Sequence, residues 1–113
     1  MRTVQKLSLD ALAREQLERA VASSSGRAAR TVFGGHEHLL RQTLMAITRG
    51  AVMAEHDSPG EATLQVRSGR VRLTAGDDTW DGRSGDLLII PAIPHALEAL
   101  EDSVVLLTVV KRP

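Results

Sequence analysis

Apolar positions follow two different periods along this chain, and the change falls near Gly26. Upstream of it, apolar residues recur at the spacing of a helix face and predict one amphipathic helix over residues 8–22. Ser8 is suited to begin this helix, because a serine side chain at that point accepts a hydrogen bond from the first turn. The predicted buried face consists of Leu9, Leu12, Ala13, Leu17, Ala20 and Val21.

After Gly26 the apolar residues alternate or form short runs, and turn-forming residues separate them. This pattern predicts strands, and no later segment reads as a crossover helix. The predicted strands are 29–33, 39–47, 52–54, 62–67, 71–74, 79–81, 87–90, 95–100 and 104–110. The sequence therefore predicts an all-β domain over residues 29–113, preceded by a helix and linker over residues 1–28.

Composition and charge narrow the functional classes. The chain has 113 residues, enough for one core and one domain. Its 14 basic and 14 acidic residues balance, and the basic ones are scattered, which disfavours binding to nucleic acid. No apolar run approaches the roughly 20 residues of a membrane span, and the N-terminus lacks the apolar centre of a secretory signal. We therefore expect a cytoplasmic protein that binds neither nucleic acid nor a membrane.

The residue types that are rare or missing also limit the chemistry. The chain has no cysteine, which excludes disulfides and thiolate sites, and no tyrosine, which excludes a phenolic acid or base. Phe33 and Trp80 are its only large aromatic residues. Any pocket is therefore expected to be lined by aliphatic side chains, which offer few faces for stacking a ring.

Two segments place a histidine beside a turn and an apolar run. Residues 50–69 read GAVMAEHDSPGEATLQVRSG, and residues 85–95 read GDLLIIPAIPH. Five residues separate Gly50 from His56, Gly69 ends the first segment, and fifteen residues separate the two segments. In this order and spacing they resemble the two motifs of the cupin superfamily.

The chain departs from these motifs at three places. Ser58 stands where a second histidine is expected, Ala62 where a glutamate is expected, and the turn before His95 is one residue shorter than the common form. The resemblance covers roughly residues 29–110. It implies a double-stranded β-helix, the cupin jelly-roll barrel, with a ligand site at its mouth around His56 and His95.

Strand alternation sorts the residues after the first turn into two faces. Ala62 and Leu64 share the face predicted to point into the barrel, whereas Glu61 lies on the opposite face. Pro59 and Gly60 directly precede this strand and could shift its register. Glu61 therefore stays a third candidate metal ligand beside the two histidines.

Other residues are candidates for the same pocket. His95 has the parity of Leu97, so both are expected inside the barrel. His36 and His38 form a second pair, suited either to a metal or pH-sensitive contact or to a solvated hairpin end, and they or Gln42 reach the pocket if their strand lines it. The predicted pocket-lining residues are Ser58, Ala62, Leu64, Gln42 and Leu97.

Two classes of function remain open. In the first, the protein binds a small molecule without strong catalysis, its metal affinity is weak, and the histidines form hydrogen bonds within a polar pocket. In the second, His56 and His95, with Glu61 or water, hold one divalent ion of iron, manganese, zinc, nickel or copper for a dioxygenase or isomerase reaction. A transcription regulator is disfavoured, because a single helix without a basic face supplies no helix-turn-helix pair.

Self-association is the remaining expectation. A barrel of this size leaves strand edges that proteins normally cover or pair. The apolar stripe of the predicted helix also needs a surface to pack on. We therefore expect a homodimer in which residues 1–48 contribute to the interface.

Overall fold

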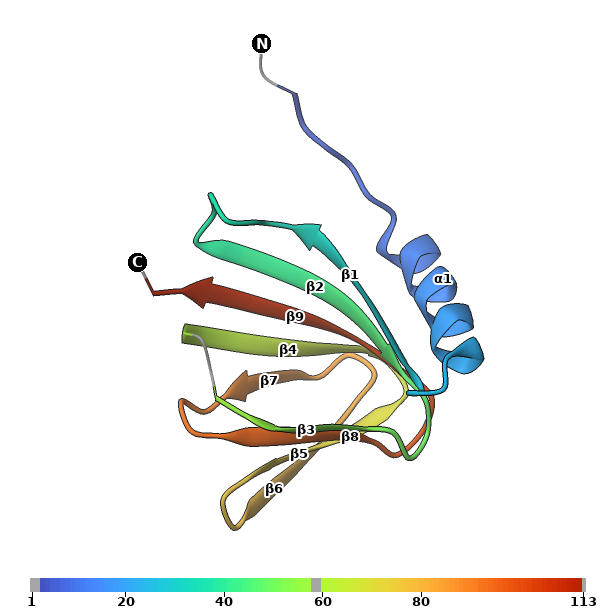
Figure 1. Ribbon diagram of the computed structural model, residues 1–113, viewed down its shortest axis with the longest axis vertical. Coiled ribbons are helices and arrows are strands. Elements are labelled where there is room, and N and C mark those ends of the chain that lie inside the picture. The colour runs from blue at the N-terminus through green and yellow to red at the C-terminus, as the bar shows by residue number, and fades with distance from the viewer. Residues whose placement is uncertain (1–2, 58–59, 113) are drawn as a thin grey trace.

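One helix and nine strands make up the computed structural model, which describes residues 3–57 and 60–112 (Figure 1). The helix begins one residue later than predicted, after Ser8, and most of the strands extend a residue or two beyond the predicted ends. Their bounds are α1 (Leu9–Ala22), β1 (Arg27–Phe33), β2 (Leu40–Ile47), β3 (Val52–His56), β4 (Gly60–Ser68), β5 (Arg70–Ala75), β6 (Asp78–Arg83), β7 (Leu87–Ile90), β8 (His95–Ala99) and β9 (Ser103–Lys111).

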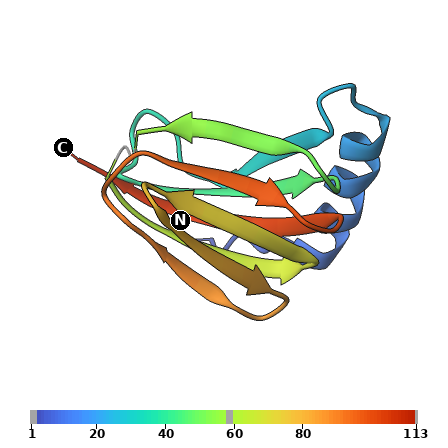
Figure 2. The same cartoon turned by 90° about the horizontal axis from the view of Figure 1, so that it is seen from below.

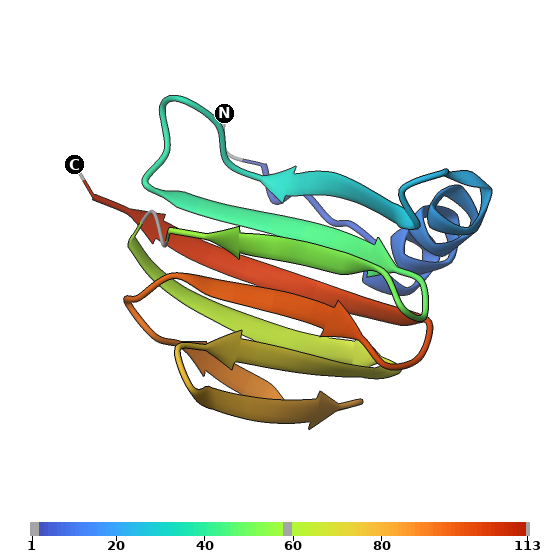
Figure 3. The ribbon, with the colours of Figure 1, turned by 60° about the horizontal axis from the view of Figure 1, so that its bottom comes forward.

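The strands form two antiparallel sheets that face each other. One sheet has the order β1-β2-β9-β4-β7 and the other the order β3-β8-β5-β6. Seen from below, the four-stranded sheet lies in front of the five-stranded one (Figure 2 and Figure 3). From β2 to β5 and from β6 to β9 each successive strand crosses to the other sheet, as in a jelly roll. The predicted all-β jelly-roll barrel with one N-terminal helix is confirmed.

Helix α1 covers one end of the outer face of the five-stranded sheet (Figure 1). Ser8 caps it, because its side chain accepts a hydrogen bond from the backbone N–H of Ala11 at 3.2 Å. The apolar side of the helix packs on outward-facing side chains of β1, β2 and β9. The five-stranded sheet of the same chain thus supplies the surface on which the stripe packs, whereas Val21, predicted on the buried face, is 65% exposed. The packed residues of the helix are Leu12, Ala13, Leu17 and Ala20.

The core lies between the two sheets and follows the strand alternation. In β4, Ala62, Leu64 and Val66 point inward, and in β5 Val71 and Leu73 do the same. Each of these five side chains is at most 9% exposed. Alternation alone thus assigns the inward faces of these central strands correctly, because neither strand has a bulge within these residues.

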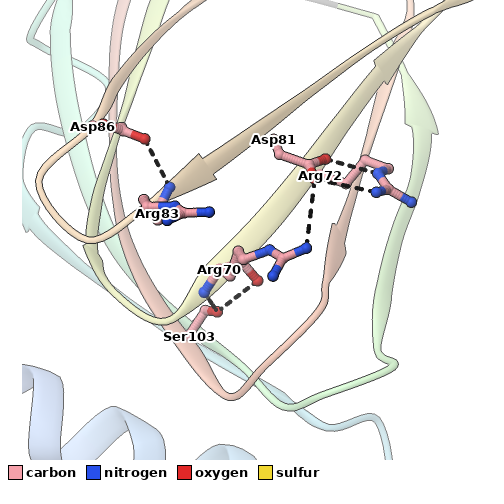
Figure 4. Close-up of polar contacts among 6 residues, drawn as sticks. All are labelled: Arg70, Arg72, Asp81, Arg83, Asp86 and Ser103. Atoms are coloured by element: carbon pink, nitrogen blue, oxygen red, sulfur yellow. Dashed lines mark hydrogen bonds and ion pairs between the residues drawn. The ribbon is translucent and has the colours of Figure 1, made fainter.

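The outer face of the four-stranded sheet is polar and ordered by an ion-pair network (Figure 4). The guanidinium of Arg72 donates from Nε and Nη2 to the two carboxylate oxygens of Asp81, at 2.8 and 3.2 Å. Arg70 Nη2 lies 3.8 Å from the same carboxylate. These contacts lower the pKa of Asp81, mainly through the hydrogen bonds from Arg72, and they raise the pKa of Arg72.

A buried serine joins the two sheets near α1. The Oγ atom of Ser103, at the start of β9, accepts a hydrogen bond from the backbone N–H of Arg70 at 2.9 Å (Figure 4). The same hydroxyl donates to the carbonyl oxygen of Glu101 at 2.7 Å. Gly69 passes so close to Ser103 that a side chain at Gly69 would overlap its backbone. These contacts tie the start of β9 to the turn between β4 and β5.

Candidate functional site

A cavity of about 210 Å³ lies between the two sheets, and its lining includes the last residue of β3 and the first residue of β8. Most of its wall is aliphatic or thioether, as the lack of tyrosine and the single phenylalanine predicted. The apolar lining consists of Met45, Met53, Ala62, Leu64, Leu73, Ile90, Leu97, Leu107 and Val109. Four polar residues complete it, and they are Arg41, His56, Asp57 and His95.

His56 and His95 meet across neighbouring strands of the four-stranded sheet. His56 is the last residue of β3 and His95 the first of β8, and the two are paired directly. Their ring centroids are 4.7 Å apart, with an angle of 60° between the rings. His95 is 5% exposed, whereas His56 is open to solvent. One imidazole therefore belongs to the wall and the other to the mouth of the cavity.

A register shift in β3 brings His56 opposite His95. Val52 and Met53 pair with Glu98 and Leu97, but the next pair is His56 with His95, so β3 contains one extra residue between Met53 and His56. Without this bulge, strict alternation from the inward Met53 would turn His56 outward. His95 points inward without a bulge, because it alternates regularly with Leu97 along β8.

The backbone orients both imidazoles in the same way. Nδ1 of His56 lies 3.0 Å from the carbonyl oxygen of Ala54, and Nδ1 of His95 lies 3.0 Å from that of Ile93. A carbonyl oxygen only accepts, so Nδ1 is the donor in each ring. Nε2 of each neutral ring then carries a lone pair, and neither Nε2 has a partner within residues 3–57 and 60–112.

Three of the predicted pocket-lining residues are in the cavity wall. Ala62 and Leu64 line it from β4, and Leu97 lines it from β8. Ser58 lies outside the described residues.

The structure places Glu61 and Gln42 away from the cavity. The pairing of β4 with β9 is regular from Gly60 to Val66, so no register shift turns Glu61 inward and it stays exposed on the outer face. Gln42 also points outward, and its Nε2 donates to Thr108 Oγ1 at 3.1 Å. Glu61 is therefore not the third ligand that we had kept as a candidate.

Sequence reasoning missed two polar residues of the cavity, Arg41 and Asp57. Arg41 lies one position before Gln42 and has the parity of Met45, which is buried in the core. That parity was the available signal, because a strand residue four positions from a core methionine faces the same way. Asp57 directly follows the β3 bulge, which no sequence pattern predicted.

The second histidine pair does not belong to this site. His36 and His38 lie in the loop between β1 and β2. The ring of His38 is 4.9 Å from that of Phe33, and its backbone N–H donates to the carbonyl oxygen of Gly35. The structure therefore agrees with the alternative of a solvated hairpin end.

Two imidazoles are fewer ligands than a resident metal ion takes. Protein metal sites of this chemistry use three or four nitrogen, oxygen or sulfur ligands. Within residues 3–57 and 60–112, no three histidine, aspartate or glutamate side chains are grouped to hold one. Ala62 occupies the wall where the cupin motif has glutamate. The described residues thus do not fit a tightly held metal ion.

Comparison with protein families matches residues 43–111 to the cupin domain family, more than half of the chain. The chain belongs to this family. A conserved protein of unknown function from Streptococcus pyogenes is similar over 100% of this chain and 92% of its own, with 26% identity and a TM-score of 0.75.

More distant cupins share the fold. A cupin superfamily protein from Desulfitobacterium hafniense is 17% identical, with a TM-score of 0.70, over 76% of this chain and 78% of its own. Salicylate 1,2-dioxygenase from Pseudoaminobacter salicylatoxidans, in complex with gentisate, has a TM-score of 0.77 and 17% identity, over 88% of this chain and 32% of the dioxygenase. The comparison with curated proteins gave no match. Among the described residues, no helix has the length and apolar character to cross a membrane.

Proposed function

We propose that this cupin binds a small organic molecule in the cavity beside His56 and His95. The observation that carries the proposal is an aliphatic cavity of about 210 Å³ whose wall includes two imidazoles with unpartnered Nε2 atoms among the described residues. Ligand sites in proteins are typically apolar hollows with a few oriented polar groups. This cavity has that composition.

The two parts of the wall contribute differently to binding. Burial of ligand surface against Met45, Leu64 and Leu107 supplies about 25 cal/mol per Å² of apolar area removed from water. The Nε2 atoms of His56 and His95 accept hydrogen bonds from a ligand hydroxyl or amide when the rings are neutral. Affinity thus comes mainly from the apolar wall and orientation from the imidazoles.

The cavity contains its own reporters for a binding experiment. Met45 and Met53, two of the three methionines of the chain, line its wall. With ¹³C-labelled methionine methyl groups, we expect binders from a fragment library to shift the Met45 and Met53 signals together. Ala62→Leu, which fills part of the cavity, should weaken these responses, whereas His36→Ala/His38→Ala should leave them unchanged. A full library that moves neither methyl signal would contradict the proposal.

A divalent-metal enzyme of the dioxygenase or isomerase type is the second candidate. It is favoured by the hydrogen bonds from Nδ1 of His56 and His95 to carbonyl oxygens, which leave Nε2 free in the manner of metal-ligating histidines. With only two such ligands we expect weak, substoichiometric metal in untagged protein. Elemental analysis of the wild type and of His56→Ala/His95→Ala decides between the candidates, since stoichiometric metal lost in the double variant would establish the second.

We also propose a homodimer to which residues 1–48 contribute. Beyond the end of α1, the outer face of the five-stranded sheet carries Leu40 and Val110, which are paired and 38% and 41% exposed. The neighbouring pair on this face, Gln42 and Thr108, is uncharged, and one carboxylate, that of Glu61, lies beside Val110. An apolar face with few charges suits burial against an identical face in a two-fold dimer.

A further inference from the structure

We propose that the ligand of the cavity is a small organic anion, and that Arg41 holds its carboxylate. This inference rests on the proposed function and adds the chemical class of the ligand. It follows from the position of Arg41, from the lack of a partner for its guanidinium among the described residues, and from the size and polarity of the remaining wall.

Arg41 faces the cavity from the sheet opposite the histidines. It pairs with Val109 of β9, which in turn pairs with Ala62 of β4, and all three line the cavity. His56 and His95 belong to the four-stranded sheet. A molecule between the sheets therefore has the guanidinium on one side and the imidazoles on the other.

The guanidinium of Arg41 has no partner among residues 3–57 and 60–112. Its side chain is half-buried, and no hydrogen bond or ion pair joins it to any described residue. Arg72, by contrast, is satisfied by two hydrogen bonds to Asp81. A cation that is partly removed from water is costly unless it is paired. A carboxylate supplies the missing acceptor, because its two oxygens match the fork of the guanidinium donors.

The cavity also limits the size and the charge of the ligand. A protein cavity of roughly 150 Å³ holds a benzene molecule, so about 210 Å³ has room for a ring or a short branched chain that carries a carboxylate. Asp57 lines the same cavity from the exposed end of β3. Its negative charge disfavours a second anionic group on the ligand, and the ligand class is therefore a monocarboxylate with a compact apolar body.

Matched pairs of probes separate charge from shape. We expect benzoate and 4-methylpentanoate to shift the methyl signals of Met45 and Met53, and to bind about ten- to a hundredfold more tightly than benzamide and 4-methylpentanamide. The acid and the amide of each pair have nearly the same size, so the apolar wall treats them alike. The difference between their affinities measures the contribution of the carboxylate.

Substitutions then assign this preference to Arg41. Arg41→Met should reduce binding of the acid to about the level of the amide, and Arg41→Lys should retain part of the advantage of the acid. Arg30→Met is the matched control, because Arg30 lies on the neighbouring strand β1, opposite Leu44 of the outward face, and outside the cavity. Asp57→Asn should tighten binding of the acids severalfold by removing the opposing charge. The methyl spectrum of each free variant shows whether it is folded.

The outcomes distinguish this inference from the proposed function. Acids and amides that bind the wild type equally would overturn the role of Arg41 and leave the cavity as a ligand site. A folded Arg41→Met variant that loses acid and amide binding to the same extent would also overturn it, because the residue would then shape the wall only. If neither the acids and amides nor the fragment library shifts the two methyl signals, both proposals fail.

Discussion

His56 and His95 reach the same point of the barrel by different local routes. His95 follows the regular alternation of β8, so its inward position can be predicted from that of Leu97 two residues later. His56 depends on the extra residue in β3, which turns it to the side of its partner. Gly50 and Gly69 of the first motif have a structural role in the backbone. Both have a positive φ, +85° and +83°, which residues with a side chain rarely adopt.

Gly69→Ala is predicted to destabilise the protein by more than the about 1–2 kcal/mol that a left-handed L-residue costs. Its added Cβ would overlap the Ser103 hydroxyl and the Asp102 carbonyl, and would lie 2.7 Å from Ser103 Cα. Gly50→Ala is the matched control, because it has a similar φ and no atom within 4 Å. Urea unfolding of the two variants separates strain from overlap, and equal losses would show that the contact with Ser103 does not matter.

At the scale of elements, the inner face of the four-stranded sheet lines the cavity and its outer face carries an ion pair that joins two strands. Its inner face contributes Leu73, Leu97 and the histidine pair to the cavity. Its outer face is held by charged groups, with Asp81 of β6 bonded to Arg72 of β5. Pairing of β5 with β6 is thus reinforced by a cross-strand ion pair on the side away from the ligand site.

The pH dependence of stability should reveal this ion pair. Hydrogen bonds from Arg72 hold the pKa of Asp81 below its ordinary value, so the folded state favours the carboxylate. The stabilisation is present above the pKa of the unfolded chain and is lost as the pH falls through the lower folded value. We therefore expect Asp81→Asn to be slightly less stable than the wild type at neutral pH, with the difference vanishing in strong acid. Thermal unfolding between pH 2 and 7 measures it, and a difference that grows on acidification would contradict the assignment.

At the scale of the whole molecule, the cavity and the proposed dimer face lie on opposite sides of the five-stranded sheet. Arg41 faces inward and Leu40 and Gln42 outward, so adjacent residues of β2 serve different surfaces. Helix α1 covers the end of the outer face at Leu44 and Ala46, and it leaves Leu40 and Val110 exposed. A dimer formed through Leu40 and Val110 would bury apolar surface on the outer side of the sheet and would not fill the cavity on its inner side.

Light scattering at micromolar concentration is expected to give the mass of a dimer. Leu40→Glu should shift the protein to a monomer, because it replaces half of the exposed Leu40–Val110 pair of the proposed face with a charge. Thr79→Glu adds the same charge on the outer face of the other sheet, opposite Thr74, and should leave the dimer intact. A wild-type protein that stays strictly monomeric would contradict the proposal.

Much of the fold could be predicted because its signals are local. The helical spacing of Leu12 and Leu17, the turn at Gly26 and the alternation through Ala62 and Leu64 each depend on residues close in sequence. The same alternation predicts Glu61 on the outer face, and the structure places it there. A register shift before this strand would have turned Glu61 inward, but the pairing with β9 is regular at this residue.

The composition of the site, by contrast, depended on contacts between distant strands. The sequence by itself determined an all-β domain with an aliphatic interior and marked His95 as inward, because periodicity and turn residues act within a few positions. The jelly-roll barrel followed from the resemblance of residues 50–69 and 85–95 to the cupin motifs. Only the tertiary structure decided that Arg41, on a different sheet, faces the same cavity and that one extra residue in β3 aligns His56 with His95. The register of strands far apart in the chain is set by their mutual packing, and no local pattern encodes it.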